Sequence, residues 1–254
     1  MTSIATTIDI PFILSLPKLK RLNFYCLDEL HKGSFHFEKC GLLSKSTSLE
    51  ELSIGDSCDL VLSHIDEFLQ NLKFLKNLSV HNTSFLNEYT ANRYQFSLLC
   101  FSFTAHTAVP MYLQFFLNDH QKSIEKLQYG PVLSYHELRT LLSFPNLSEL
   151  KLLRISFEAK EHQNYPVNCS ISSIEIEGHY KNADDLNVVI NNLLYVLKHL
   201  KFLTLSHFDG NILESVFTSK SLRKIEYSSI HNVSTHQKIR MMMSRRILFL
   251  CNQF

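Results

Sequence analysis

A six-residue pattern, apolar at its first, fourth and sixth positions, limits what this chain can fold into. Its clearest copy is Leu147-x-x-Leu150-x-Leu152. The step from Leu150 to Leu152 has the period of a strand, because alternate residues of a strand face the same side. A helix would need another apolar residue four positions after Leu147, and that residue is Lys151. The hexad therefore predicts a short strand that is entered from a turn.

Nine copies of this hexad occur along the chain, at intervals of 22 to 30 residues. Their first residues are Leu19, Leu49, Leu75, Leu98, Ile124, Leu147, Ile171, Leu200 and Leu222. One short strand cannot bury its apolar edge alone, so each copy needs an equivalent strand beside it. The near-constant spacing predicts a stack of repeats in which each unit contacts its neighbours.

Helical patterns occupy several of the segments between the hexads. Ser134-x-x-Glu137 is a capping-box sequence, and it predicts a helix that ends before Pro145. Apolar residues at helical spacing predict further helices over 59–71, 111–120 and 182–199, and the link 156–170 reads as a loop. Alternating strands and helices predict parallel strands joined by right-handed crossovers.

The hexads resemble the leucine-rich repeat, L-x-x-L-x-L-x-x-N/C-x-L, whose period is roughly 20–29 residues. The resemblance covers nearly the whole chain. It implies an α/β solenoid of horseshoe shape, with about nine parallel strands on the concave face and helices and loops on the convex face. The repeats are long and irregular and carry no asparagine ladder. In this they resemble the ribonuclease-inhibitor class and the repeat region of F-box proteins.

We expect a single leucine-rich-repeat domain over residues 1–254. Its parts are a partial N-terminal unit at 1–18, nine repeats at 19–233 and a capping helix at 234–254. The last segment places apolar residues on one helical face, with Lys238, Arg240, Arg245 and Arg246 beside it. Such a helix could also lie on a membrane or bind an acidic partner, but capping the open end of the solenoid is the commoner role.

Cysteine usage and the N-terminal residues indicate a cytoplasmic or nuclear protein. The six cysteines are scattered and form no C-x-x-C pair, which is typical of a reducing compartment. Residues 1–17 contain no basic n-region, and the chain has no run of 18 apolar residues. Five N-x-S/T sequons, at Asn77, Asn82, Asn146, Asn168 and Asn232, keep an extracellular pattern-recognition repeat protein open as the alternative.

The concave face is the expected binding surface. It comprises the third and fifth residues of each hexad and the residue after the hexad, because the first, fourth and sixth residues face the core. On it, Phe202 and Leu153 lie among carboxylates, and Glu175 and Glu177 predict a negatively charged recognition strip. The predicted partner-binding residues are Tyr25, His81, Lys151, Leu153, Glu175, Glu177, Phe202 and Glu226.

Candidate chemistry is weak, so we expect no enzyme, no cofactor and no metal. The 13 histidines form no H-x-x-x-H pair on a helix, and no phosphate-binding glycine loop or G-x-S-x-G motif is present. Cys100 and His81 could approach each other as a nucleophile and its base, but no third residue is in place to orient them. A net charge of +1 gives no basic surface for nucleic acid.

These observations predict a non-enzymatic scaffold, expected to be a monomer, that binds a protein partner on its concave face. The resemblance to F-box proteins implies a sharper role as the substrate-recognition part of a ubiquitin-ligase receptor. No F-box precedes the repeats in this chain, so contact with the ligase adaptor would need an upstream segment. The sequence does not identify the partner.

Overall fold

The computed structural model describes much of each hexad but leaves gaps between them. The described residues are 16, 18–24, 35–36, 48–55, 60–61, 69–81, 94–104, 112–154, 164–177, 183–206, 219, 221–228 and 248–252. The chain divides into two compact units, Met1–Ile124 and Glu125–Phe254, called here unit 1 and unit 2.

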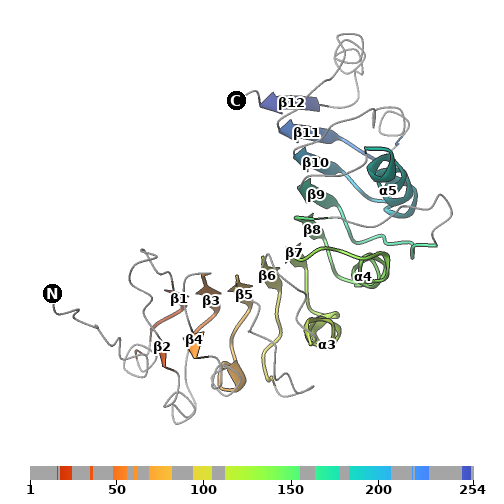
Figure 1. Cartoon of the computed structure of the whole chain (residues 1–254). Helices are drawn as coiled ribbons and strands as arrows, with labels where there is room; N and C mark the ends of the chain where they lie inside the picture. Colours follow the sequence, from red (N-terminus) through yellow and green to blue (C-terminus); the bar gives the residue numbers. More distant parts are fainter. Residues whose placement is uncertain are drawn as a thin grey trace. The chain divides into compact units, whose positions relative to one another are not determined.

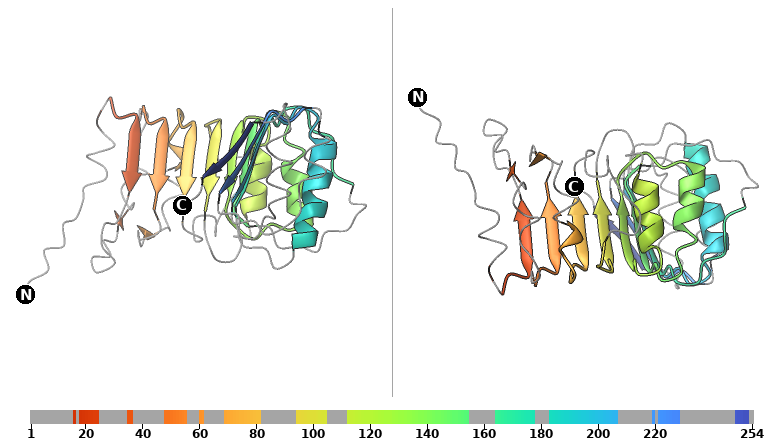
Figure 2. Two further views of the ribbon diagram at one scale, coloured as in Figure 1. Left: turned by 90° about the horizontal axis from the view of Figure 1, so that it is seen from above. Right: turned by 90° about the horizontal axis from the view of Figure 1, so that it is seen from below.

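Unit 1 contains a parallel sheet with one strand for each of the first four hexads. In spatial order its strands are β1 (Arg21–Phe24), β3 (Glu51–Ile54), β5 (Asn77–Val80) and β6 (Cys100–Phe103). They pair without any shift in hexad register, so that Leu22 lies opposite Leu52 and Leu52 opposite Leu78. Figure 2 shows these strands side by side with their arrows pointing the same way.

Unit 1 contains three further elements outside this sheet. They are β2 (Phe35–His36), β4 (Leu60–Val61) and helix α3 (Leu113–His120). β2 and β4 form a separate two-stranded parallel sheet. The prediction of a helix over 59–71 is therefore wrong at Leu60 and Val61, where backbone pairing with β2 overrides the local helical spacing, and right at residues 69–70. α3 confirms the helix predicted over 111–120.

Unit 2 continues the same plan, with one strand per hexad and one strand more. Its strands, again parallel and in spatial order, are β7 (Lys126–Tyr129), β8 (Glu149–Leu152), β9 (Ser173–Glu177), β10 (Phe202–Ser206), β11 (Lys224–Ser228) and β12 (Leu248–Asn252). The helices α4 (Tyr135–Leu141) and α5 (Ala183–Val196) lie on one side of these strands (Figure 1). Both units are thus α/β stacks of parallel repeats, as a solenoid requires.

The hexad positions predict the core. From the second hexad to the eighth, every first, fourth and sixth residue is buried, with at most 3% of its surface exposed. The third and fifth residues alternate with them and are half-buried or exposed. Burying one Leu, Ile, Val or Phe side chain contributes about 1.5–3 kcal/mol, and each of these seven repeats buries three large side chains at these positions. Leu19 and Leu22 are only half-buried, because β1 is at the end of the strand order in its unit.

A repeated backbone contact explains why the hexad starts with a three-residue step. The carbonyl oxygen of Lys20, the second residue of its hexad, accepts the N–H groups of Glu50 at 2.8 Å and Glu51 at 3.0 Å. The same double acceptance recurs at the second hexad residue elsewhere, at Glu50, Lys76, Glu125, Ser148, Ser172 and Lys201. The chain turns at this point and places the first hexad residue in the core before the strand begins.

The predicted capping box begins helix α4. Ser134 Oγ accepts the N–H of Glu137, and the Glu137 carboxylate accepts the N–H of Ser134 at 2.7 Å. The other Glu137 oxygen accepts the buried Tyr129 hydroxyl at 2.8 Å. Burial, followed by the Glu137 charge and this hydrogen bond, raises the pKa of Tyr129. The capping residue therefore also ties the helix to strand β7.

Buried Asn168 organises the turn between α4 and β9. Its Nδ2 donates to the carbonyl oxygens of Leu142 at 2.8 Å and Phe144 at 3.1 Å. Its Oδ1 accepts the N–H groups of Ser170 and Ile171 and the Ser170 hydroxyl, at 2.8 to 2.9 Å. One side chain thus satisfies backbone groups from two adjacent repeats, which is how irregular buried backbone avoids an unpaired polar group.

The C-terminal capping helix predicted over 234–254 is wrong at residues 248–252, which form strand β12. β12 pairs with β11 so that Phe249 lies opposite Ile225 and Cys251 opposite Tyr227. These registers define a further hexad, Arg246-x-x-Phe249-x-Cys251, whose first residue is a cation rather than an apolar residue. Pairing with β12 satisfies the N–H and C=O groups that β11 would otherwise leave open.

Candidate protein-recognition surface

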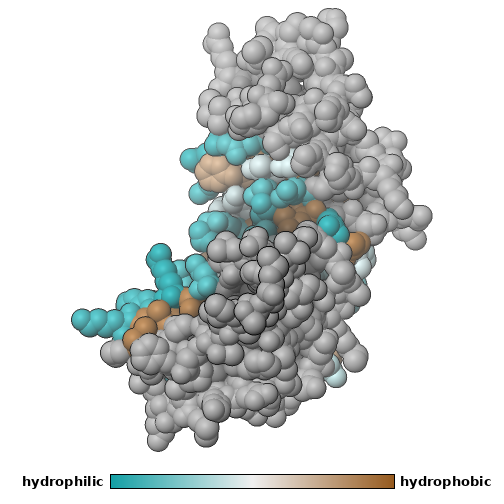
Figure 3. Space-filling model, turned by 60° about the vertical axis from the view of Figure 1, so that its left-hand side comes forward, coloured by the Kyte–Doolittle hydropathy of each residue, from teal (hydrophilic) through white to brown (hydrophobic). Residues whose placement is uncertain are grey.

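The predicted concave residues of unit 2 share one face of its sheet, called here the open face. By strand register, the third hexad residues on it are Lys126, Glu149, Ser173, Phe202 and Lys224. The fifth hexad residues are Gln128, Lys151, Glu175, Thr204 and Glu226. Hydrophilic residues cover much of the coloured surface in Figure 3, with smaller hydrophobic areas between them.

Lys151 is the centre of the charge arrangement on this face. Its ammonium lies 3.0 Å from a Glu175 oxygen and 3.2 Å from a Glu177 oxygen. Burial alone would lower the pKa of Lys151, but hydrogen bonds and charge interactions with the two glutamates outweigh it and raise that pKa. The prediction of a negative strip is therefore wrong in its simple form, because one ammonium neutralises part of both carboxylates.

The remaining charges of the open face are paired too. Lys126 contacts Glu149 at 2.7 Å, and Lys224 forms an ion pair with Glu226. With Lys151, Glu175 and Glu177, the face carries three cations and four carboxylates. Such pairs hold long side chains in fixed positions but add little stability, typically about 0–1 kcal/mol each. The face is electrically mixed, without a dominant sign.

Phe202 is the main apolar residue of the open face. It lies opposite Ser173 on β9 and Lys224 on β11, and 43% of its side chain is exposed. Leu153, which follows β8, is half-buried. Sequence reasoning missed that Leu248 and Leu250 of β12 take register positions opposite Lys224 and Glu226. The signal for them was the hexad that starts at Arg246, hidden by its cationic first residue.

Unit 1 gathers small polar residues at the corresponding positions. The His81 ring contacts the Thr104 hydroxyl through Nδ1 and lies 3.4 Å from Ser79 Oγ through Nε2. Cys100 lies opposite Asn77. It is four residues along the strand from Thr104, or about 13 Å at the usual strand rise. The cysteine and histidine considered as a nucleophile pair are therefore kept apart. Tyr25 lies outside the described residues.

A small pocket lies beside the last turn of α3 in unit 1, and sequence reasoning did not find it. It has a volume of about 260 Å³ and is lined by Tyr94, Phe96, Ser97, Asp119, His120, Lys122 and Ser123. His120 Nε2 is buried without a hydrogen-bond partner in the described part of the chain, so it does not face the pocket as an open donor or acceptor.

Two further findings concern metal-binding groups and membrane-spanning helices. Within the described residues, no group of three or more His, Cys, Asp or Glu side chains is placed to hold a metal ion. In the same part of the chain, no helix combines the length and apolar character that crossing a membrane requires.

Comparisons with known proteins do not assign the chain to a family. No protein-family model matches it, and no curated protein matches it.

Proposed function

We propose that this protein is a leucine-rich-repeat recognition scaffold that binds a protein partner on the open face of unit 2. The observation that carries the proposal is Phe202, a 43% exposed aromatic residue on the middle of a parallel sheet. Exposed aromatic anchors surrounded by polar residues are typical of the residues that dominate protein–protein binding. The sheet holds such an anchor in place at little entropic cost.

The charge arrangement supports a protein partner rather than a nucleic acid. Lys126, Lys151 and Lys224 are each paired with carboxylates of neighbouring hexad positions. A phosphate backbone is bound by cations that release counterions, and cations already paired to carboxylates supply little of that effect. A mixed rim of fixed charges instead favours a partner with a complementary mixture of charges.

The sharper form of the proposal is a substrate receptor of the F-box type. Its basis is the irregular repeat resemblance: long units, helices between strands and no asparagine ladder. In that role the open face would bind the substrate, and an F-box encoded upstream would bind the ligase adaptor. Co-purification of a cullin-complex adaptor with a longer product of the gene would support it, and an adaptor-free product that still binds its partner would contradict it.

The alternative is an extracellular pattern-recognition protein, suggested by the five sequons. Asn168 is 5% exposed and its Nδ2 donates to two backbone carbonyl oxygens, so it offers no room for a glycan. Asn77 lies within strand β5, and Asn146 is exposed in a turn. Asn82 and Asn232 lie outside the described residues. Mass spectrometry of the protein from its own cells distinguishes the two functions, because glycan on Asn82 or Asn232 favours the alternative.

The test of the main proposal is affinity purification of the tagged protein from its own cells, followed by quantitative mass spectrometry. Phe202→Ala removes the anchor, and Glu175→Lys places a second cation beside Lys151. The matched control is Tyr195→Ala, which removes a 73% exposed aromatic residue from α5 in the same unit. Losing a central anchor costs at least about 1.4 kcal/mol, so roughly tenfold lower recovery of the partner is expected.

The results with the three variants distinguish binding on the open face from binding on the helical side of unit 2. A partner lost with Phe202→Ala and Glu175→Lys but retained with Tyr195→Ala supports recognition by the open face. Equal recovery with all three variants contradicts the proposal, and loss only with Tyr195→Ala moves the site to the helical side of unit 2. Far-UV circular dichroism of each variant confirms that the fold is intact.

A further inference from the structure

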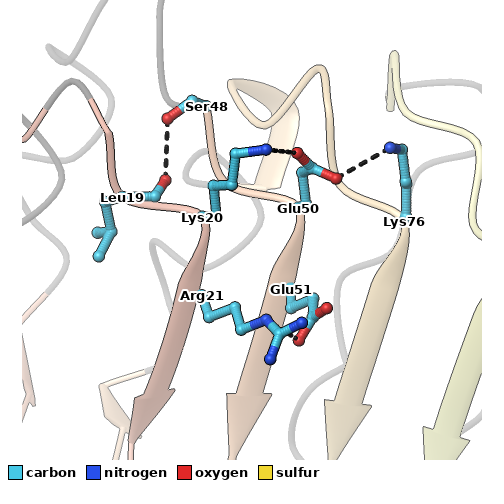
Figure 4. A network of polar contacts seen from close by, with 7 residues as sticks. All are labelled: Leu19, Lys20, Arg21, Ser48, Glu50, Glu51 and Lys76. Atoms are coloured by element: carbon cyan, nitrogen blue, oxygen red, sulfur yellow. Dashed lines mark hydrogen bonds and ion pairs between the residues drawn. The ribbon is translucent and has the colours of Figure 1, made fainter.

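Three side chains at the edge where strands of unit 1 begin form an ion-pair ladder. Glu50 lies between Lys20 and Lys76, with its two oxygens 2.9 Å from one ammonium each (Figure 4). These three residues are the second residues of successive hexads. Hydrogen bonds from Lys20 and then Lys76, with their charges, lower the pKa of the Glu50 carboxyl to about 2. The second hexad position therefore brings neighbouring side chains into direct contact.

The same position in unit 2 has a different composition. From β7 to β11 it holds Glu125, Ser148, Ser172, Lys201 and Arg223. The backbone places the last two side by side, because the Arg223 N–H donates to the Lys201 carbonyl oxygen at 2.8 Å. Both side chains are exposed, and neither has an ion-pair partner among the described residues. Two cations are adjacent here, where unit 1 has a carboxylate between its cations.

More positive charge lies next to this pair. Lys198 and His199 precede the same strand and are exposed. The Lys198 ammonium lies 4.5 Å from the centre of the Tyr195 ring, which is 73% exposed. The nearest carboxylate at the second hexad position is Glu125, three strands from Lys201, or about 14 Å at the usual strand spacing. That exceeds the screening length of about 8–10 Å at physiological salt, so Glu125 does not compensate the pair.

We propose that this edge, formed by Lys198, Lys201 and Arg223, binds a carboxylate of an acidic segment in a partner protein. The carboxylate lies over Lys201 and Arg223, which belong to adjacent strands, and each of its oxygens contacts one of these cations, just as each Glu50 oxygen contacts one lysine. Lys198 and the Tyr195 ring lie beside it and receive the next residue of the segment. The site lies at the edge of the open face, because Lys201 and Arg223 immediately precede Phe202 and Lys224, but its contacts do not include Phe202.

Two features favour a carboxylate from a protein. The ladder in unit 1 shows that second hexad positions of adjacent strands bring an ammonium and a carboxylate into direct contact, at 2.9 Å on each side of Glu50. Tyr195 adds exposed aromatic surface, which contributes to contacts with protein side chains. The Arg223 guanidinium presents a planar fork of donors that suits a carboxylate, and two adjacent cations on one rigid edge set the spacing of the acidic residues.

The experiment measures binding of a fluorescein-labelled eight-residue glutamate peptide to the full chain by fluorescence anisotropy at 50 mM salt. Three variants each change the net charge by −2: Lys201→Ser with Arg223→Ser, Lys201→Glu alone, and Lys20→Ser with Lys76→Ser. Serine is the residue found at the same position at Ser148 and Ser172, so the first variant suits the fold. Lys201→Glu supplies the carboxylate within the chain, beside Arg223. The third variant is the control for net charge.

The expected result is a three- to tenfold weaker affinity for the first two variants and a change of less than twofold for the Lys20 and Lys76 control. Binding should also weaken strongly between 50 and 300 mM salt. Equal weakening in all three variants would show attraction to net charge alone and overturn the proposal. So would absence of binding to the unmodified chain, or tighter binding of a phosphoserine peptide than of the glutamate peptide. A matched glutamine peptide should not bind.

Discussion

Acid should destabilise unit 1 through one buried histidine, His120. His120 is the last residue of helix α3, and only 6% of its surface is exposed. The ring is parallel to Phe96 within 4°, with centroids 5.3 Å apart, and its centroid lies 4.8 Å from that of Phe116. Nε2 has no hydrogen-bond partner in the described part of the chain. This site accepts a neutral imidazole and opposes a charged one.

The size of this loss of stability follows from the pKa of His120. Burial lowers it from 6.5 to about 4, and the Asp119 carboxylate raises it only in part. A pKa difference of 1 between the folded and the unfolded chain changes the free energy of unfolding by about 1.4 kcal/mol, so protonation of His120 costs about 3 kcal/mol of stability in full. Above pH 6.5 the imidazole is neutral in both states and nothing is lost. As the pH falls from 6.5 to 4, the unfolded chain takes up the proton first, and stability decreases.

The perturbation is His120→Phe, which keeps a flat ring against Phe96 and removes the titrating group. At pH 7 its stability should be within about 1 kcal/mol of the unmodified protein, because an unpaired polar atom is replaced by an apolar one of similar shape. Urea unfolding is followed by far-UV circular dichroism between pH 7 and pH 4, since the chain contains no Trp. The stability difference between the two proteins should change by about 3 kcal/mol across this range.

The control is His136→Phe, which replaces an exposed histidine on α4. Its pH profile should match that of the unmodified protein. Parallel profiles for His120→Phe and the unmodified protein would refute the reasoning. Nuclear magnetic resonance gives an independent check, since a His120 imidazole that titrates near pH 6.5 in the folded protein would contradict its burial as a neutral ring.

Two other predictions concern the polar contacts between repeats. Asn168→Leu leaves the Leu142 and Phe144 carbonyl oxygens and two N–H groups unpaired, so the urea midpoint should fall by the equivalent of about 3 kcal/mol, with exposed Asn191→Leu as the control. Glu50, with its pKa of about 2, stabilises the fold above pH 4.5, and this contribution disappears as the pH falls from 4.5 to 2. Glu50→Gln should flatten the profile in that window, whereas Glu125→Gln should not.

The hexads alone were enough to predict most of the fold. All nine predicted strands are present, and their first, fourth and sixth residues make the core wherever side chains are described from the second hexad to the eighth. The capping box at Ser134 and the helix over 182–199 were also readable, because both depend on residues within one or two turns of each other. β12 was missed because its hexad begins with Arg246, and pairing with β11 is a contact that local periodicity does not encode.

The sequence predicted which residues of the candidate site share a face, but it did not predict how their charges are paired. Alternation along each strand was enough to place Lys151, Glu175, Glu177, Phe202 and Glu226 on one face. It could not show that Lys151 contacts both glutamates, because that depends on which residues adjacent strands bring opposite each other. A strip expected to be negative became a mixed one for this reason.

The sequence by itself determined the repeating unit, because the alternation of a strand and the spacing of a helix are set by residues close together in the chain. Only the tertiary structure decided the partners of individual polar side chains. Asn168 finds the carbonyl oxygens of the preceding repeat, and His120 loses its access to water between Phe96 and Phe116. The same second hexad position pairs charges at Glu50 and leaves Lys201 beside Arg223. Strand register, which joins residues more than 20 positions apart, makes that difference.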